Sequence, residues 1–171
     1  FLRIGPRIVI GIPTGTTDLE RRAVRSSAMS AGAREVFTVA ESMAAAIGIG
    51  LPVETPTGNM IVDIGAGSTE IAVIALSGIV AETSIRVAGD KMDAALMAWV
   101  RKTHNVLIGS STAESVKMRI GSAWPEDDEQ EMEAGGRDLL TGLPHTITIT
   151  SHEVREALRE PIGQITKAVL K

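Results

Sequence analysis

The stretch IVDIGAGSTE, residues 61–70, runs from a buried-looking strand through an acid into a glycine-rich turn. Gly65 and Gly67 lack the Cβ that would block close approach to the backbone or disfavour a positive φ. Successive backbone N–H groups in such a turn can point at an anion, and the two hydroxyl residues that follow add donors. Asp63, at the strand end, can hold Mg²⁺ or its waters beside a phosphate. The stretch therefore indicates either a nucleotide-phosphate site or an ordinary hairpin turn; it is not a P-loop, because no Gly-Lys-Ser/Thr follows.

The composition of the whole chain narrows the function classes. Its 171 residues, 44% hydrophobic and 22% charged, suit one domain or two small lobes. Only 2% are aromatic, which argues against base stacking on single-stranded nucleic acid, and a net charge of −4 without a basic run argues against binding to a phosphate backbone. The absence of cysteine excludes disulfides and thiolate metal sites and fits a cytoplasmic, reducing compartment. No apolar run reaches the ~18 residues of a membrane span.

Hydrophobic periodicity predicts an α/β fold with a mixed sheet. Strands are expected at 7–13, 35–39, 59–65, 69–76 and 79–88, with one or more further strands between 125 and 150. Helices are expected at 17–32, 40–50, 89–105, 110–124 and 151–171. The chain starts without a Met, almost directly on a strand, so we expect it to be a piece of a longer protein.

Local signals predict where several elements begin and turn. They are the capping boxes Thr17 with Glu20 and Ser111 with Glu114, the N-cap Ser151, a tight hairpin at Ser77-Gly78, and a kink or break at Pro161.

Two further groups of side chains are candidates for a site. Glu41 follows a strand and opens an Ala-rich helix, where it could orient a water or merely complement the helix dipole. Glu114 and Lys117 share a helix face, where they could contact one ligand or form a solvated ion pair. The three histidines share no metal-ligand spacing.

Read in order, four segments of the chain form one pattern. They are REVFTVAESMAAAIGIGLPV, GNMIVDIGAGSTEIAVIALSGIV, RVAGDKMDAAL and STAESVKMRIGSAWP. Together they resemble the MreB family of bacterial actin-like proteins and, more distantly, the actin and heat-shock-chaperone ATPase superfamily. The similarity covers nearly the whole chain, from about Pro6 to the C-terminus.

This resemblance implies a ribonuclease-H-like, actin-like mixed sheet with helices on both faces and a small inserted α+β subdomain. It implies a core subdomain made of residues 1–88 and 151–171, and a smaller inserted outer subdomain made of residues 89–150. Proteins of that family bind ATP or ADP and Mg²⁺ in a cleft between two similar halves. The chain resembles the second half only, so by itself it is expected to be a poor ATPase.

The resemblance also assigns roles to individual positions. Asp63 falls where the family holds an aspartate near Mg²⁺, through water, and Glu41 falls where a carboxylate positions the hydrolytic water. The positions around the nucleotide are, by the same resemblance, Gly65, Ala66, Gly67, Ser68 and Thr69 at the phosphates, Gly89 and Asp90 in the cleft, and Glu114 and Lys117 at the adenosine.

Three residues depart from the family pattern. Ser42 stands where a proline commonly follows the glutamate, Ala66 replaces a middle glycine, and Ala88-Gly89 replaces a Gly-Gly pair. Ala66 is acceptable if its φ is negative. Loss of the proline frees the backbone at Glu41, which would slow hydrolysis.

The function implied is therefore part of an ATP-binding, filament-forming homologue of actin involved in cell shape. Its expected partners are other copies of itself, cell-wall synthesis proteins and the inner membrane, without nucleic acid. Two alternatives stay open: an actin-like ATPase of a chaperone or cell-division branch, and a non-enzymatic scaffold whose ATPase has decayed.

Overall fold

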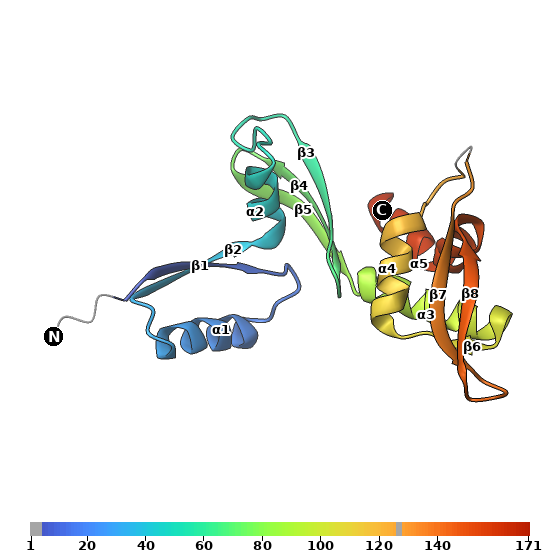
Figure 1. Cartoon of the computed structure of the whole chain (residues 1–171). Coiled ribbons are helices and arrows are strands. Elements are labelled where there is room, and N and C mark those ends of the chain that lie inside the picture. Colours follow the sequence, from blue (N-terminus) through green and yellow to red (C-terminus); the bar gives the residue numbers. More distant parts are fainter. Residues whose placement is uncertain (1–4, 126–127) are drawn as a thin grey trace. The chain divides into compact units, whose positions relative to one another are not determined.

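The computed structural model describes residues 5–125 and 128–171. The chain divides into two compact units, each with strands and helices (Figure 1). The first unit holds residues 5–63 and 69–85; the second unit holds residues 64–68 and the described residues from 86 onward. The alternation of strands and helices confirms the predicted α/β class.

The first unit runs strand, helix, strand, helix, and then three consecutive strands. These elements are β1 (Arg7–Ile12), α1 (Asp18–Ser30), β2 (Glu35–Ala40), α2 (Glu41–Gly48), β3 (Asn59–Ile64), β4 (Thr69–Ala75) and β5 (Gly78–Ile85). β1 and β2 pair in parallel, whereas β4 and β5 pair antiparallel in a second sheet of order β3-β4-β5. Parallel and antiparallel pairing are both present, as predicted, but they lie in separate hydrogen-bonded sheets.

The core of the first unit forms between α2 and the β3-β4-β5 sheet. Ala46 of α2 is fully buried with Ala72 and Ile74 of β4. These β4 residues alternate along the strand, so they share one face of the sheet. α2 therefore starts beside β2 and covers β4, which fixes the end of β2 close to the three-stranded sheet.

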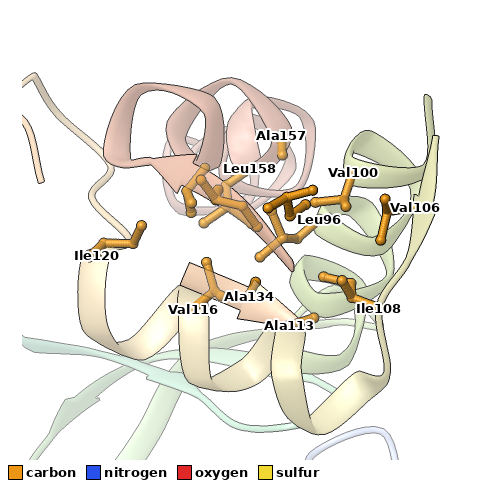
Figure 2. Close-up of a cluster of buried hydrophobic side chains, with 13 residues drawn as sticks. Leu96, Val100, Val106, Ile108, Ala113, Val116, Ile120, Ala134, Ala157 and Leu158 are labelled. Carbon is orange, nitrogen blue, oxygen red and sulfur yellow. The ribbon is translucent and has the colours of Figure 1, made fainter. Parts of the chain in front are cut away.

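The second unit packs three helices around a small antiparallel sheet. Its elements are α3 (Gly89–His104), β6 (Val106–Leu107), α4 (Ser110–Ile120), β7 (Glu131–Asp138), β8 (Pro144–Thr150) and α5 (Ser151–Val169). Figure 2 shows the core, in which Leu96 and Val100 of α3 face Val116 of α4 and Leu158 of α5. Aliphatic residues build this core, since the chain has almost no aromatic residues.

The last helix, α5, packs on α3 and α4 of the second unit. The physical reason is its apolar stripe, Val154, Ala157 and Leu158, which is buried in the core of that unit. The division into an actin-like core and an inserted subdomain stays a prediction for the intact parent.

The predicted helix starts are right in one case and wrong in two. Thr17 and Glu20 form the expected capping box of α1. α4 begins at Ser110, without a side-chain cap, so the capping box predicted at Ser111 is absent. α5 is capped by Thr150, not by Ser151.

Ser151 has another role, which explains its displacement from the cap position. It is 1% exposed, its hydroxyl donates to Glu129 Oε2 at 2.6 Å, and its Oγ accepts from the backbone N–H of Gln130 at 3.1 Å. The helix continues through Pro161 to Val169 and does not end at the proline.

α4 ends at Ile120, four residues earlier than predicted, because the chain becomes extended at Gly121. A Cβ at Gly121 would collide with the carbonyl oxygen of Lys117. Glycine is thus required for the chain to leave α4 in this direction.

The hairpin between β4 and β5 turns one residue earlier than predicted. Ala75 pairs with Gly78, so the central turn residues are Leu76 and Ser77, with φ of 51° and 60°. Two positive φ values define a turn that favours Asn-Gly. The backbone N–H of Leu76 donates to Thr55 O at 2.9 Å, which holds the leucine there although it is 69% exposed.

The double substitution Leu76→Asn with Ser77→Gly is expected to stabilise the first unit by about 1–2 kcal/mol, because it removes the left-handed strain of a leucine. Both tryptophans, Trp99 and Trp124, lie in the second unit, so amide hydrogen exchange of β4 and β5 is the suitable measurement. Leu140→Asn, at an exposed position without a positive φ, is the control for loss of surface leucine. Unchanged exchange in the double variant would contradict the prediction.

Candidate functional site

The residues predicted to form the site fall into two groups, one in each unit. Glu41, Asp63 and Thr69 lie in the first unit; Gly65, Ala66, Gly67, Ser68, Gly89, Asp90, Glu114 and Lys117 lie in the second. Each group is described within its own unit.

The glycine-rich loop of residues 65–68 is docked on the start of α3. The backbone N–H of Gly65 donates to Ser68 O at 3.0 Å, which closes the loop. The N–H groups of Gly89 and Asp90 then donate to the carbonyl oxygens of Gly65 and Ala66, at 3.1 and 2.8 Å. The carbonyl groups of Gly65 and Ala66 are thereby bonded to the start of the helix.

Ala66 and Gly67 of this loop are both exposed. Within the described part of the chain, no backbone hydrogen bond involves either N–H. Neighbouring free amides in a turn form a concavity that favours an anion. The loop therefore has the donors expected of a phosphate-binding turn.

The loop glycines are not needed for backbone conformation. None of residues 65–68 has a positive φ, so Ala66 meets the condition set for it and is tolerated without strain. A Cβ at Gly65 or Gly67 would meet only ordinary contacts, Ser68 O at 3.4 Å and Asp90 Oδ2 at 4.0 Å. Because these two glycines have no side chain, a ligand can approach the backbone of the loop closely.

Gly89 is more closely packed than the glycines of the loop. A Cβ there would lie 3.3 Å from Gly65 O and 3.5 Å from Lys117 Nζ. The preceding Ala88 is fully buried with φ −161°, an extended conformation open to any residue, so its departure from Gly-Gly is accommodated.

Lys117 of α4 is bonded to the first turns of α3. Its Nζ donates to the carbonyl oxygen of Gly89 at 3.3 Å and lies 2.8 Å from Asp93 Oδ1. Both side chains of the ion pair are largely buried, at 18% and 14% exposure. Asp93 was not predicted from sequence, because its partner lies on a different helix.

Glu114 is not brought to Lys117. It lies on the exposed face of α4, and no ion pair between the two side chains occurs in the described residues. The ion pair predicted for Glu114 and Lys117 is therefore not formed. The role of Glu114 at the adenosine remains a prediction.

In the first unit, three carboxylates lie close enough to interact electrostatically. Glu41 starts α2, Asp63 lies near the end of β3, and Glu70 is the second residue of β4. Glu70 is only 2% exposed, while the other two are half-buried. The side chain of Glu41 lies over Gly11 of β1, whose ideal Cβ would be 3.1 Å from Glu41 Cγ.

These surroundings raise the pKa of Glu41. Partial burial of the carboxyl is the main cause, and the negative charges of Glu70 and then Asp63 add to it. A carboxylate whose pKa is raised in a site is a candidate for proton transfer, since its ionised form binds a proton more readily.

The donors present fit a hydrated Mg²⁺ and not an all-protein metal cage. Across residues 5–125 and 128–171, no group of three or more His, Asp or Glu side chains is arranged to hold a metal ion. Mg²⁺ commonly keeps several waters and uses one or two carboxylates together with substrate phosphates. Asp63, half-buried at a strand end, can supply such a contact through water.

Gly11, Thr14 and Glu70 were not predicted from the sequence. Glu70 had one usable signal, since it is the only charged residue in the apolar strand TEIAVIA. A polar residue inside a buried strand is more informative than an exposed one. Gly11 and Thr14 carried no signal, because their importance depends on the parallel pairing of β1 with β2.

Ser42, which departs from the expected proline, is buried within α2. It is fully inaccessible, and its hydroxyl has no hydrogen-bond partner among the described residues. Glu41 keeps its position as the first residue of α2, with Ala40 as an N-cap that makes no side-chain hydrogen bond.

Within the part of the chain that the structure describes, no helix is both long and apolar enough to cross a bilayer. Membrane association stays a proposal.

Comparison with known proteins shows which family has this sequence and fold. The family model described as MreB/Mbl protein matches residues 2–171. The cell shape-determining protein MreB of Escherichia coli (strain K12) is 51% identical over 170 residues, which is 99% of this chain and 49% of that protein. The chain thus spans about half the length of the curated relatives that it matches.

Solved structures agree with the sequence comparison. MreB5 of Spiroplasma citri bound to ADP superposes with a TM-score of 0.93 and 38% identity, over 96% of this chain and 50% of that one. The same protein bound to AMPPNP superposes with a TM-score of 0.91 and 39% identity, over 95% and 49%. The family match over nearly the whole chain, with this fold and this loop, shows that the chain belongs to the MreB/Mbl family.

Proposed function

We propose that this chain is part of an ATP-binding, filament-forming actin homologue that acts in cell shape. The single observation that carries the proposal is the loop of residues 65–68, whose carbonyls are bonded to α3 while the N–H groups of the exposed Ala66 and Gly67 make no backbone hydrogen bond among the described residues. Support comes from the family membership and from relatives solved with AMPPNP and ADP. The chain covers half of those relatives, so the activity belongs to the intact parent protein.

In this proposal the backbone amides of Ala66 and Gly67 and the hydroxyl of Ser68 bind phosphate oxygens. Asp63 holds a Mg²⁺-bound water, and the metal, when bound, neutralises charge on the phosphates. Glu41 orients the water for in-line attack and accepts its proton. In the second unit, the family resemblance assigns Gly89, Asp90, Glu114 and Lys117 to the nucleotide, with Lys117 acting through its contact with Gly89.

The proposed partners are further copies of the parent in a filament, together with cell-wall synthesis proteins and the inner membrane. The proposed location is the cytoplasm. These assignments depend on the family resemblance, and the relatives' description as cell shape-determining proteins supports them.

The test is nucleotide-dependent sedimentation of the full-length parent. We expect polymer to pellet with Mg²⁺ and ATP, and Asp63→Asn to weaken apparent nucleotide affinity by roughly 10- to 100-fold, the usual effect of losing a metal contact. Asp18→Asn, at an exposed position on α1, is the matched control.

Two other outcomes would favour the alternatives. Polymer that forms equally without nucleotide and never releases phosphate would indicate a scaffold with a decayed ATPase. Phosphate release without polymer would indicate an actin-like ATPase of a chaperone or cell-division branch.

A further inference from the structure

The carboxylate of Glu70 is buried at the start of β4 and is hydrogen-bonded to Thr14. Both of its oxygens accept from the backbone N–H of Thr14, at 3.1 and 3.0 Å. Oε2 also accepts from the Thr14 hydroxyl at 3.0 Å. Thr14 lies 56 positions away in sequence, so this contact ties the end of β1 to β4.

Among the described residues, no cation balances this buried acid. In residues 5–125 and 128–171, none of the ion pairs formed by lysine, arginine or histidine includes Glu70. The charges that act on the nearby Glu41 are those of two carboxylates, Glu70 and Asp63. Burying an unpaired charge is unfavourable, and hydrogen bonds to it compensate only in part. A buried acid without a cation partner is more readily explained by a role in a functional site than by a contribution to the stability of the fold.

The topology brings Glu70 to the place where Glu41 lies. β1 and β2 run in parallel, with Ile12 opposite Ala40, so their carboxyl ends are adjacent. Thr14 follows β1 by two residues, and Glu41 follows β2 directly. Ligands of parallel sheets bind outside the carboxyl ends of the strands.

The side chain of Glu41 also lies against Gly11 of β1. Its Cγ lies against Gly11, where a Cβ would approach to 3.1 Å. Thr14, three residues further on, is held by Glu70. The backbone of residues 11–14 is therefore fixed at one end under Glu41 and at the other by Glu70.

We propose that Glu70 is a positioning residue for Glu41: its buried carboxylate holds Thr14, and with Gly11 it sets where the Glu41 carboxylate lies. The inference rests on the proposed function, in which Glu41 orients the attacking water. It adds to that function a residue that does not itself touch the nucleotide.

The first test titrates the Glu41 side-chain carboxyl by ¹³C NMR in this chain, in the wild type, in Glu70→Gln and in Glu82→Gln. Glu82 lies exposed on β5, so it provides the same chemical change elsewhere in the unit. Loss of the Glu70 charge is expected to lower the pKa of Glu41, because one of the neighbouring negative charges that raise it is gone. The Thr14 amide is expected to exchange faster with solvent in the same variant.

Glu82→Gln should change neither quantity. A folded Glu70→Gln chain in which the Glu41 titration and the Thr14 amide are both unchanged would overturn the proposal.

The second test uses Thr14 in the full-length parent and avoids altering a buried charge. Thr14→Ala removes the hydroxyl bond to Glu70 but keeps the backbone bonds. We expect kcat for phosphate release to fall about tenfold with little change in KM, since misplacing a catalytic group lowers the rate more than binding. Thr14→Ser, which keeps the hydroxyl, should restore the rate.

Equal rates for Thr14→Ala and wild type would count against Glu70 as a positioning residue. A wild-type parent that releases no phosphate would refute the proposed function instead. In that case the titration of Glu41 in this chain still decides whether Glu70 and Thr14 set its environment.

Discussion

In the full-length parent, Glu41→Gln is expected to slow phosphate release by about 10²- to 10⁴-fold, the usual contribution of a general base. Glutamine keeps the size of the side chain and its place over Gly11, so the fold should be unchanged. It cannot accept the proton of the attacking water. Nucleotide binding and polymerisation should persist, because neither needs that proton transfer.

The pH profile gives this prediction a second measurement. Because burial and the charges of Glu70 and Asp63 raise the pKa of Glu41, its ionised form is lost at a higher pH than for an ordinary glutamate. The wild-type rate should therefore fall on acidification while ordinary glutamates are still ionised. The residual rate of Glu41→Gln should lack this acid limb.

Glu54→Gln is the matched control, since Glu54 is an exposed glutamate of the same unit. It should leave the rate and its pH profile unchanged. A Glu41→Gln protein that hydrolyses ATP at the wild-type rate would remove Glu41 from the mechanism and favour the scaffold alternative.

The second large effect is expected in the core of the second unit. Gly136 of β7 lies against β6, where an added Cβ would be 2.6 Å from the carbonyl oxygen of Leu107 and would also collide with Val106. Val106 is fully buried in the core. Gly136→Ala must therefore move backbone and core together, and we expect it to lower the free energy of unfolding by about 3 kcal/mol.

The neighbouring glycine provides an unusually close control. Gly135 lies on the same strand, and a Cβ there would meet nothing within 4 Å. Gly135→Ala should be neutral or stabilise by about 0.5–1 kcal/mol, since alanine is favoured over glycine inside a strand.

Urea unfolding followed by tryptophan fluorescence measures both variants, because Trp99 packs against this core. Similar unfolding free energies for the two variants would show that the close approach of β6 to Gly136 does not matter for stability.

Much of the local structure was predictable from sequence because its signals are local. The Thr17–Glu20 capping box lies within one helical turn, and it forms as predicted. The loop at Asp63–Thr69 was recognisable because glycines, an acid and hydroxyls are contiguous. Ser111 is not a cap because α4 begins one residue before it, and Ser151 is bonded to Glu129 instead of capping α5.

The candidate site was predictable only for residues that belong to contiguous motifs. Glu41 and Gly65–Ser68 lie in such motifs, and the family match over residues 2–171 agrees with that pattern. Thr14 and Glu70 could not be paired from sequence, since 56 positions separate them and only folding brings them together. The same holds for Lys117 with Asp93, whose ion pair joins two helices.

The sequence by itself therefore determined the α/β class, the family and the phosphate-type loop, because periodicity and short motifs are written along the chain. Tertiary structure alone decided that α5 packs with α3 and α4, and that a buried, unpaired carboxylate holds the end of β1 beside Glu41. The physical reason is that burial and charge balance depend on which distant segments meet. A linear pattern does not contain that information.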